Sequence, residues 1–264
     1  MVFVAALPLT VLLLLAEGAV GGMLILLFTD LEGRVSPGFL ISSGAILAVD
    51  GVVAYLLKFG YGDAADGMGT YLGALTILLV AYVALVALKR RGVARGISIL
   101  SVIAGGVILV QSATLEAHYA GTPTLVAVAL AAWITGAALT ALLLGHWYLV
   151  TPLLSPKSLT RVTEILLTGL VIQAVFFLFE LASSGTDGSA IDRILAAVAA
   201  AGFVFWFRLL VGTVFPIVLT ILTWRACHIR AMQTATGFLY IIFGSVAAGD
   251  VAAKVFTIVT SIPA

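Results

Sequence analysis

The chain has 264 residues, of which 62% are hydrophobic and only 9% are charged, and its formal net charge is +1. A soluble domain carries roughly 25% charged residues, so this composition excludes a water-soluble globular enzyme and gives no reason to expect a nucleic-acid partner. The mean hydropathy of +1.24 indicates a protein whose surface faces lipid. The single cysteine, Cys227, excludes a disulfide framework and a CxxC redox or zinc site, and we expect no metal site.

Apolar runs of about 20 residues, the length that crosses a bilayer, follow one another along the whole chain. They predict an all-α, polytopic integral membrane helix bundle that forms a single transmembrane domain over residues 1–264. The predicted spans, about eight in number, lie near 5–28, 37–59, 69–88, 96–116, 124–149, 160–182, 200–224 and 234–262. The first run has no basic residue before Arg34, so we expect a retained helix and not a signal peptide.

The segment 190–224 is too long for one ordinary span. Two arrangements are open: it begins as a short interfacial helix, or it forms one strongly tilted helix. Pro216 lies inside the run and predicts a bend, which a helix bundle tolerates when neighbours satisfy the freed carbonyl.

The basic residues are distributed unequally between alternate connections. Nine Lys and Arg residues follow spans one, three, five and seven, against two on the opposite side, Lys58 and Arg193. Because cytoplasmic loops are enriched in Lys and Arg, this bias predicts that both termini are extracytoplasmic. We expect a multi-pass protein of the cell membrane, of prokaryotic type.

Small residues recur where helices would approach one another closely. Gly18 and Gly22 form a GxxxG pattern in the first span, and further glycines fall at mid-membrane depth, among them Gly136, Gly212 and Gly249. Such residues let helix backbones pack together, and they indicate a close bundle without indicating a function.

Five ionisable residues fall near the middle of their predicted spans: Glu17, Asp50, Arg208, Asp250 and Lys254. A charge at the bilayer centre costs a few kcal/mol, so such residues are candidates for function. Asp250 and Lys254 have the spacing of a helical ion pair, and Arg208 is placed to neutralise Glu17 or Asp50 across the bundle. The cluster is either an internal ion-pair network that fixes helix register or a polar site that moves protons or holds a polar head group.

A transmembrane haem b needs two axial histidines at similar depth on facing helices. Only His146 and His228 could share one iron, because His118 lies toward the other side of the membrane. His228 falls in a loop beside Arg225, so we expect no haem.

The fifth span ends in the sequence His146-Trp147-Tyr148. An imidazole, an indole and a phenol together can hydrogen-bond a quinone carbonyl and stack on its ring, so these residues are the candidate quinone site. The alternative is an aromatic belt at the membrane interface, although a belt does not need the histidine.

The expected topology and the small residues of Ala16-Glu17-Gly18-Ala19-Val20-Gly21-Gly22 resemble the eight-helix membrane-anchor subunits of polysulfide and dimethyl-sulfoxide reductases. This resemblance covers topology and no diagnostic motif. It implies a quinone-reactive or proton-conducting membrane subunit of a respiratory or electron-transfer complex, with quinone as cofactor and redox subunits as partners. The alternatives are a proton- or cation-coupled secondary transporter or channel that uses Glu17, Asp50 and Asp250, and a structural assembly subunit.

Overall fold

The computed structural model of the protein describes residues 2–60, 66–120, 123–151, 154–183 and 190–264. Within these ranges every regular element is a helix, and eight helices are long and apolar enough to cross a membrane. The principal helices are α1 (Val2–Leu31), α2 (Pro37–Leu57), α3 (Asp66–Ala87), α4 (Arg91–Ala120), α5 (Thr124–Val150), α6 (Lys157–Ser183) and α10 (Met232–Thr260), and a short 3-10 turn (Lys58–Gly60) follows α2. The prediction of an all-helical membrane bundle is confirmed.

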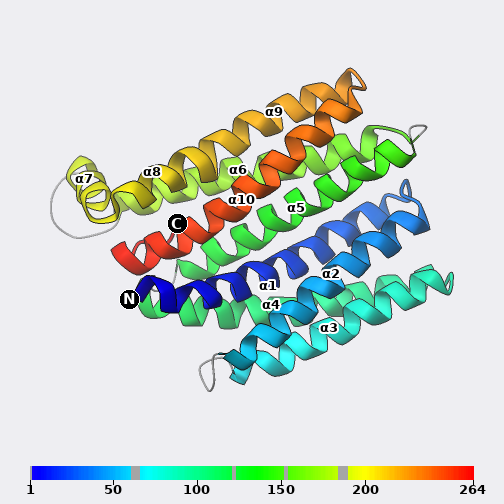
Figure 1. Cartoon of the computed structure of the whole chain (residues 1–264), viewed down its shortest axis with the longest axis horizontal. Coiled ribbons are helices and arrows are strands. Elements are labelled where there is room, and N and C mark those ends of the chain that lie inside the picture. The colour runs from blue at the N-terminus through cyan, green and yellow to red at the C-terminus, as the bar shows by residue number, and fades with distance from the viewer. Residues whose placement is uncertain (1, 61–65, 121–122, 152–153, 184–189) are drawn as a thin grey trace.

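The seventh span is assembled from several elements. A short helix α7 (Ala190–Ala201) ends at Gly202, whose positive φ of 51° breaks the chain direction. The span itself consists of α8 (Phe203–Leu209), the π-helical turn η3 (Leu210–Val214) and α9 (Phe215–His228). Of the two arrangements left open by the sequence, the structure has the separate short helix, which lies at one end of the bundle (Figure 1).

Three helices form the centre of the bundle. The shares of buried residues are 67% in the first span, 78% in the fifth and 61% in the last, against 28% in the third and fourth. The outer helices present large apolar side chains outward, such as Ile77, Ile103 and Phe179, which are 60% to 70% exposed. An apolar outer surface around a buried centre is what a lipid environment requires.

Both ends of the described chain lie at the same end of the bundle, together with α7 (Figure 1). The opposite end carries the connections that follow α1, α3, α5 and α9, and with them the nine Lys and Arg residues counted in the sequence. We call this the basic end.

Glycines set two of the closest helix contacts. A Cβ added at Gly136 of α5 would lie 2.0 Å from the backbone carbon of Gly21 in α1. A Cβ added at Gly249 of α10 would lie 2.3 Å from the Cα of Gly212 in η3. Since real Cβ atoms do not approach so closely, these glycines allow α1 to meet α5 and η3 to meet α10 backbone to backbone.

Candidate functional site

Three of the five mid-membrane charges meet inside the bundle. Lys254 Nζ of α10 lies 2.9 Å from Glu17 Oε2 of α1 and 2.8 and 2.7 Å from the two carboxylate oxygens of Asp250. Asp250 and Lys254 are one helical turn apart on α10, as their spacing predicts. We call Glu17, Asp250 and Lys254 the ion triad.

The side chains of the ion triad are almost fully buried. Glu17 is 0% exposed, Asp250 5% and Lys254 6%. Small residues of α5 close over the α10 part of the triad, and between them remains a cavity of about 10 Å³ lined by Ala127, Ala131, Asp250 and Lys254, among others. Such a space is close to that of one water molecule, which could bridge the charged groups.

A lysine between two carboxylates leaves one negative charge in excess. Burying that charge would cost several kcal/mol, because the interior has a low dielectric constant. The Arg208 guanidinium, which interacts electrostatically with Asp250, brings the sum of the four charges to zero. The arrangement is therefore neutral as a whole while each carboxylate keeps a cation within reach.

Among the residues that the structure describes, Arg208 forms no ion pair with Glu17 or Asp50, the pairing that the sequence suggested. It is 1% exposed, and no Asp or Glu of the described residues lies within 4.0 Å of its nitrogens. Nη1 donates instead to the carbonyl oxygen of Gly212 at 3.4 Å, and the guanidinium lies 5.7 Å from the ring centre of Phe177. Nε and Nη2 have no hydrogen-bond partner in the described part of the chain.

The reason for this contact is Pro216. In an α-helix the amide of residue 216 would donate to the carbonyl of Gly212, and proline has no N–H to do so. The chain responds with the π-helical turn η3, in which the Phe215 amide donates to Leu210 O. Arg208 then satisfies the carbonyl of Gly212, and Ser245 of α10 donates to Val211 O at 2.5 Å. The bend expected at Pro216 is thus a π-helical turn, a feature often found at functional sites.

Asp50 lies apart from the ion triad. It is on α2, which packs mainly against α1 and α3, and its side chain is half-buried. Within the described residues no ion pair joins it to Arg208 or Lys254. The predicted set of five charges therefore divides into the ion triad with Arg208 beside it and a separate carboxylate on α2.

The side chains of His146, Trp147 and Tyr148 diverge. His146 is exposed and approaches Tyr240 Oη of α10 with Nδ1 at 3.4 Å. Trp147 packs edge-on against Phe39 of α2, with ring centres 6.1 Å apart, and its indole N–H has no partner among the described residues. Tyr148 is buried, and its hydroxyl donates to the carbonyl of Ser155. Successive helix residues point about 100° apart, which is why the three do not line one cavity.

His228 likewise has partners of its own. Its ring lies against that of Trp224 with centres 4.1 Å apart and ring planes tilted by 51°, and Nδ1 lies 2.8 Å from the carbonyl oxygen of Trp224. His146 contacts α10, and His228 lies at the end of α9 beside α6.

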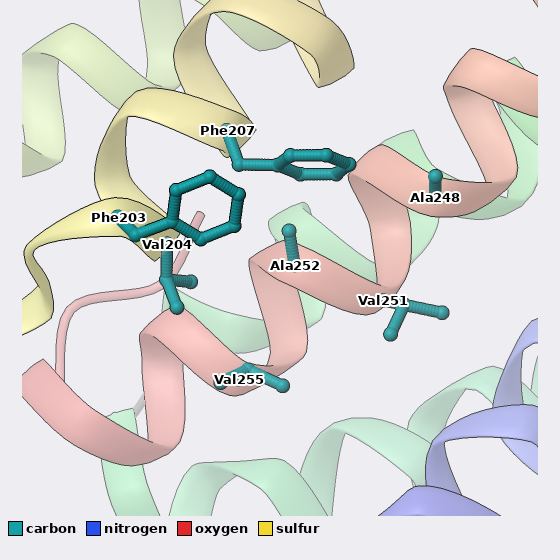
Figure 2. A pocket seen from close by; sticks show the side chains of 7 residues that line it. All are labelled: Phe203, Val204, Phe207, Ala248, Val251, Ala252 and Val255. Atoms are coloured by element: carbon teal, nitrogen blue, oxygen red, sulfur yellow. The ribbon is translucent and has the colours of Figure 1, made fainter.

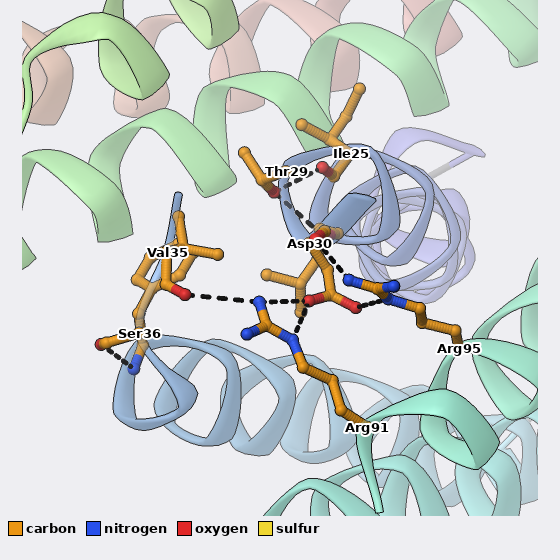
Figure 3. Close-up of polar contacts among 9 residues, drawn as sticks. Ile25, Thr29, Asp30, Val35, Ser36, Arg91 and Arg95 are labelled. Atoms are coloured by element: carbon orange, nitrogen blue, oxygen red, sulfur yellow. Dashed lines mark hydrogen bonds and ion pairs between the residues drawn. The ribbon is translucent and has the colours of Figure 1, made fainter. Parts of the chain in front are cut away.

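Sequence reasoning missed a second ionic cluster, at the basic end. Asp30 in the last turn of α1 is 1% exposed, and it accepts from Arg91 Nε at 2.5 Å and from Arg95 Nε at 2.8 Å (Figure 3). Arg95 also donates to the backbone carbonyl of Asp30, and Arg91 to that of Val35. The signal was present, because Asp30 ends the first apolar run and Arg91 and Arg95 are spaced i and i+4.

An apolar groove lies on the other side of α10. Phe203 and Phe207 of α8 face Ala248 and Ala252 of α10 across a space of about 220 Å³ (Figure 2). All of its lining side chains are hydrocarbon, so it offers no hydrogen-bond donor from a side chain.

No protein family, no curated protein and no solved structure matches this chain. The site geometry therefore carries the functional argument.

Proposed function

We propose that the protein conducts protons through the membrane, by way of the ion triad and Arg208. The observation that carries the proposal is the buried Lys254 ammonium held between the carboxylates of Glu17 and Asp250 at 2.7 to 2.9 Å. Charged groups buried at mid-membrane depth are costly and are characteristic of proton relays.

The contacts suggest how a proton would move. A proton that arrives on Asp250 neutralises its charge and weakens its hold on Lys254, which stays paired with Glu17. Arg208 is close enough to interact with the Asp250 carboxylate when that proton leaves again. Protonation of Asp250 leaves the four groups with one positive charge in excess, and loss of the proton restores a net charge of zero.

The geometry favours proton conduction over quinone binding. His146, Trp147 and Tyr148 point to different sides, and the apolar groove between α8 and α10 has no side-chain donor for a quinone carbonyl. Membership of an electron-transfer complex with partner subunits, which the resemblance implies, remains part of the proposal. A proton-conducting chain fits such a complex as well as it fits a transporter.

The test is proton flux into liposomes that contain the purified full-length chain and an internal pH dye, driven by a valinomycin-induced potassium potential. Glu17→Gln and Asp250→Asn each remove one proton-binding carboxylate and should lower the flux by at least roughly tenfold. Asp50→Asn is the matched control, since it neutralises an acid in the middle of α2 outside the ion triad. It should leave the flux unchanged.

The alternative, that the ion triad has only a structural role, leads to a different expectation. Removing one partner of a buried pair is strongly destabilising, whereas removing all charges together is nearly neutral. We therefore expect the quadruple variant Glu17→Gln/Asp250→Asn/Lys254→Met/Arg208→Gln, which removes all four charges, to fold and to conduct no protons. A stable quadruple variant with the flux of the native protein would mean that the ion triad serves only packing.

A further inference from the structure

A polar cavity at the basic end lies between the start of α6, the end of α9 and the connection after α1. Its volume is about 420 Å³. Four basic side chains line it, namely Arg34, Lys157, Arg161 and His228, and the one acid among the lining residues is Glu164.

The acids nearby neutralise these cations only in part, since two carboxylates, of Glu164 and Glu32, stand against the three formal charges of Arg34, Lys157 and Arg161. Glu164 accepts from Trp224 Nε1 at 3.1 Å. Glu32 lies 4.0 Å from Arg34 and 3.6 Å from Arg161, longer than the 2.7–2.9 Å of a strong charge-assisted hydrogen bond. Lys157 forms no ion pair with any described residue. The cavity therefore keeps an excess of positive charge and of N–H donors.

The backbone adds further donors on the same side. Within α6 the first amide bonded back to a carbonyl is that of Thr160, which donates to Pro156 O at 3.0 Å. The amides of residues 157–159 precede it, and Pro156 has no side-chain acceptor to cap them. Phosphate oxygens accept from such amides, and the helix dipole favours a negative charge there.

The surroundings place the cavity at the membrane boundary. Trp224, on the exposed face of α9 beside Glu164 and His228, is the residue type that collects at the level of lipid headgroups. We propose that this cavity binds a phosphate group, which either an anionic lipid headgroup or a soluble phosphate can supply. The site is separate from the ion triad and does not depend on proton conduction.

The experiment measures the thermal unfolding temperature of the full chain in a neutral detergent. The probes are short-chain phosphatidylglycerol against phosphatidylcholine, and inorganic phosphate against chloride at equal ionic strength. The cavity variant is Lys157→Gln/Arg161→Gln. The control variant is Lys89→Gln/Arg90→Gln, which removes the same charge from the same end of the bundle outside the cavity.

We expect an anionic probe to raise the unfolding temperature of the native chain. In the cavity variant the concentration needed for half of that shift should rise at least about tenfold, since each basic residue near an anionic headgroup contributes appreciably to binding. The control variant should respond like the native chain. A shift with phosphatidylglycerol alone identifies a lipid as the source, and a shift with inorganic phosphate identifies a soluble ligand.

Two results would overturn the proposal: no shift of the native chain with either anionic probe, or an equal loss in both variants, which would indicate diffuse surface charge. Arg161→Gln also removes the contact with Glu32, so Lys157→Gln alone provides a second measurement without that change. It should weaken the response by a smaller factor, and an unaltered response would equally contradict the site.

Discussion

At the scale of the residue, a single proline determines the environment of Arg208, which is almost fully buried. Pro216 leaves the carbonyl of Gly212 without its helical donor, and Arg208 Nη1 supplies one at 3.4 Å. The guanidinium lies at the same time against the ring of Phe177. Arg208, which the sequence suggested as a partner for carboxylates, therefore donates its hydrogen bond to a backbone carbonyl at the interruption of its own helix.

This arrangement predicts coupling between positions 208 and 216. Arg208→Ala leaves a buried carbonyl unsatisfied and should cost about 1–3 kcal/mol of unfolding free energy. In a Pro216→Ala background the restored amide can donate to Gly212 O, so the same Arg208→Ala change should cost less. A double-mutant cycle of thermal or denaturant unfolding measures the difference. Equal costs in both backgrounds would mean that the contact with Gly212 contributes nothing.

At the scale of the element, glycine positions decide how close the central helices come. A Cβ atom added at Gly136 would clash with the backbone of Gly21. A Cβ atom added at Gly106 or Gly244 would have no atom of another residue within 4 Å. All three looked alike in the sequence, as small residues at mid-membrane depth. Of these three, Gly136 is the one at the contact of α5 with α1, the helix that carries Glu17.

Gly136→Ala should therefore push α1 away from α5, with a cost of about 1–3 kcal/mol for overpacking. Because Glu17 moves with α1, proton flux should fall in the same variant. Gly106→Ala is the matched control in α4, and it should be neutral or slightly stabilising, since alanine favours helix over glycine. Unfolding temperatures in detergent would show both effects, and equal temperatures for the two variants would contradict the close contact.

At the scale of the whole molecule, charge is sorted between the two ends of the bundle. The basic end holds Asp30 with Arg91 and Arg95, where an acid ends one helix and an arginine begins another. An acid at a helix C-terminus and a base at a helix N-terminus both interact unfavourably with the helix dipole. The attraction between Asp30 and the two arginines must therefore offset that unfavourable energy. This cluster ties α1 to α4 at the end that the charge bias predicts to be cytoplasmic.

Sidedness is tested by cysteine labelling in intact cells, in a Cys227→Ala background. A cysteine at Ala65, which lies outside the described residues, should react with a membrane-impermeant reagent added from outside. A cysteine at Val93, near the basic end of α4, should be spared until the membrane is permeabilised. The reverse pattern would invert the orientation and the side of every site described above.

The sequence by itself determined the class of the protein and the position of its spans. Lipid tolerates no unpaired backbone groups, so apolar runs of sufficient length had to be helices. It also predicted the ion pair of Asp250 with Lys254, because an i, i+4 spacing is local to one helix.

Only the tertiary structure decided which distant charges meet. Glu17 joins Lys254 because α1 and α10 both pack on α5, whereas Asp50 lies on an outer helix and is left out. The tertiary structure likewise brings Asp30 to its two arginines. It also gives His146, Trp147 and Tyr148 different neighbours, because consecutive residues of a helix point in different directions. Helical periodicity fixes the direction of each side chain relative to its own axis, but the rotation of one helix against another depends on packing contacts that no local pattern contains.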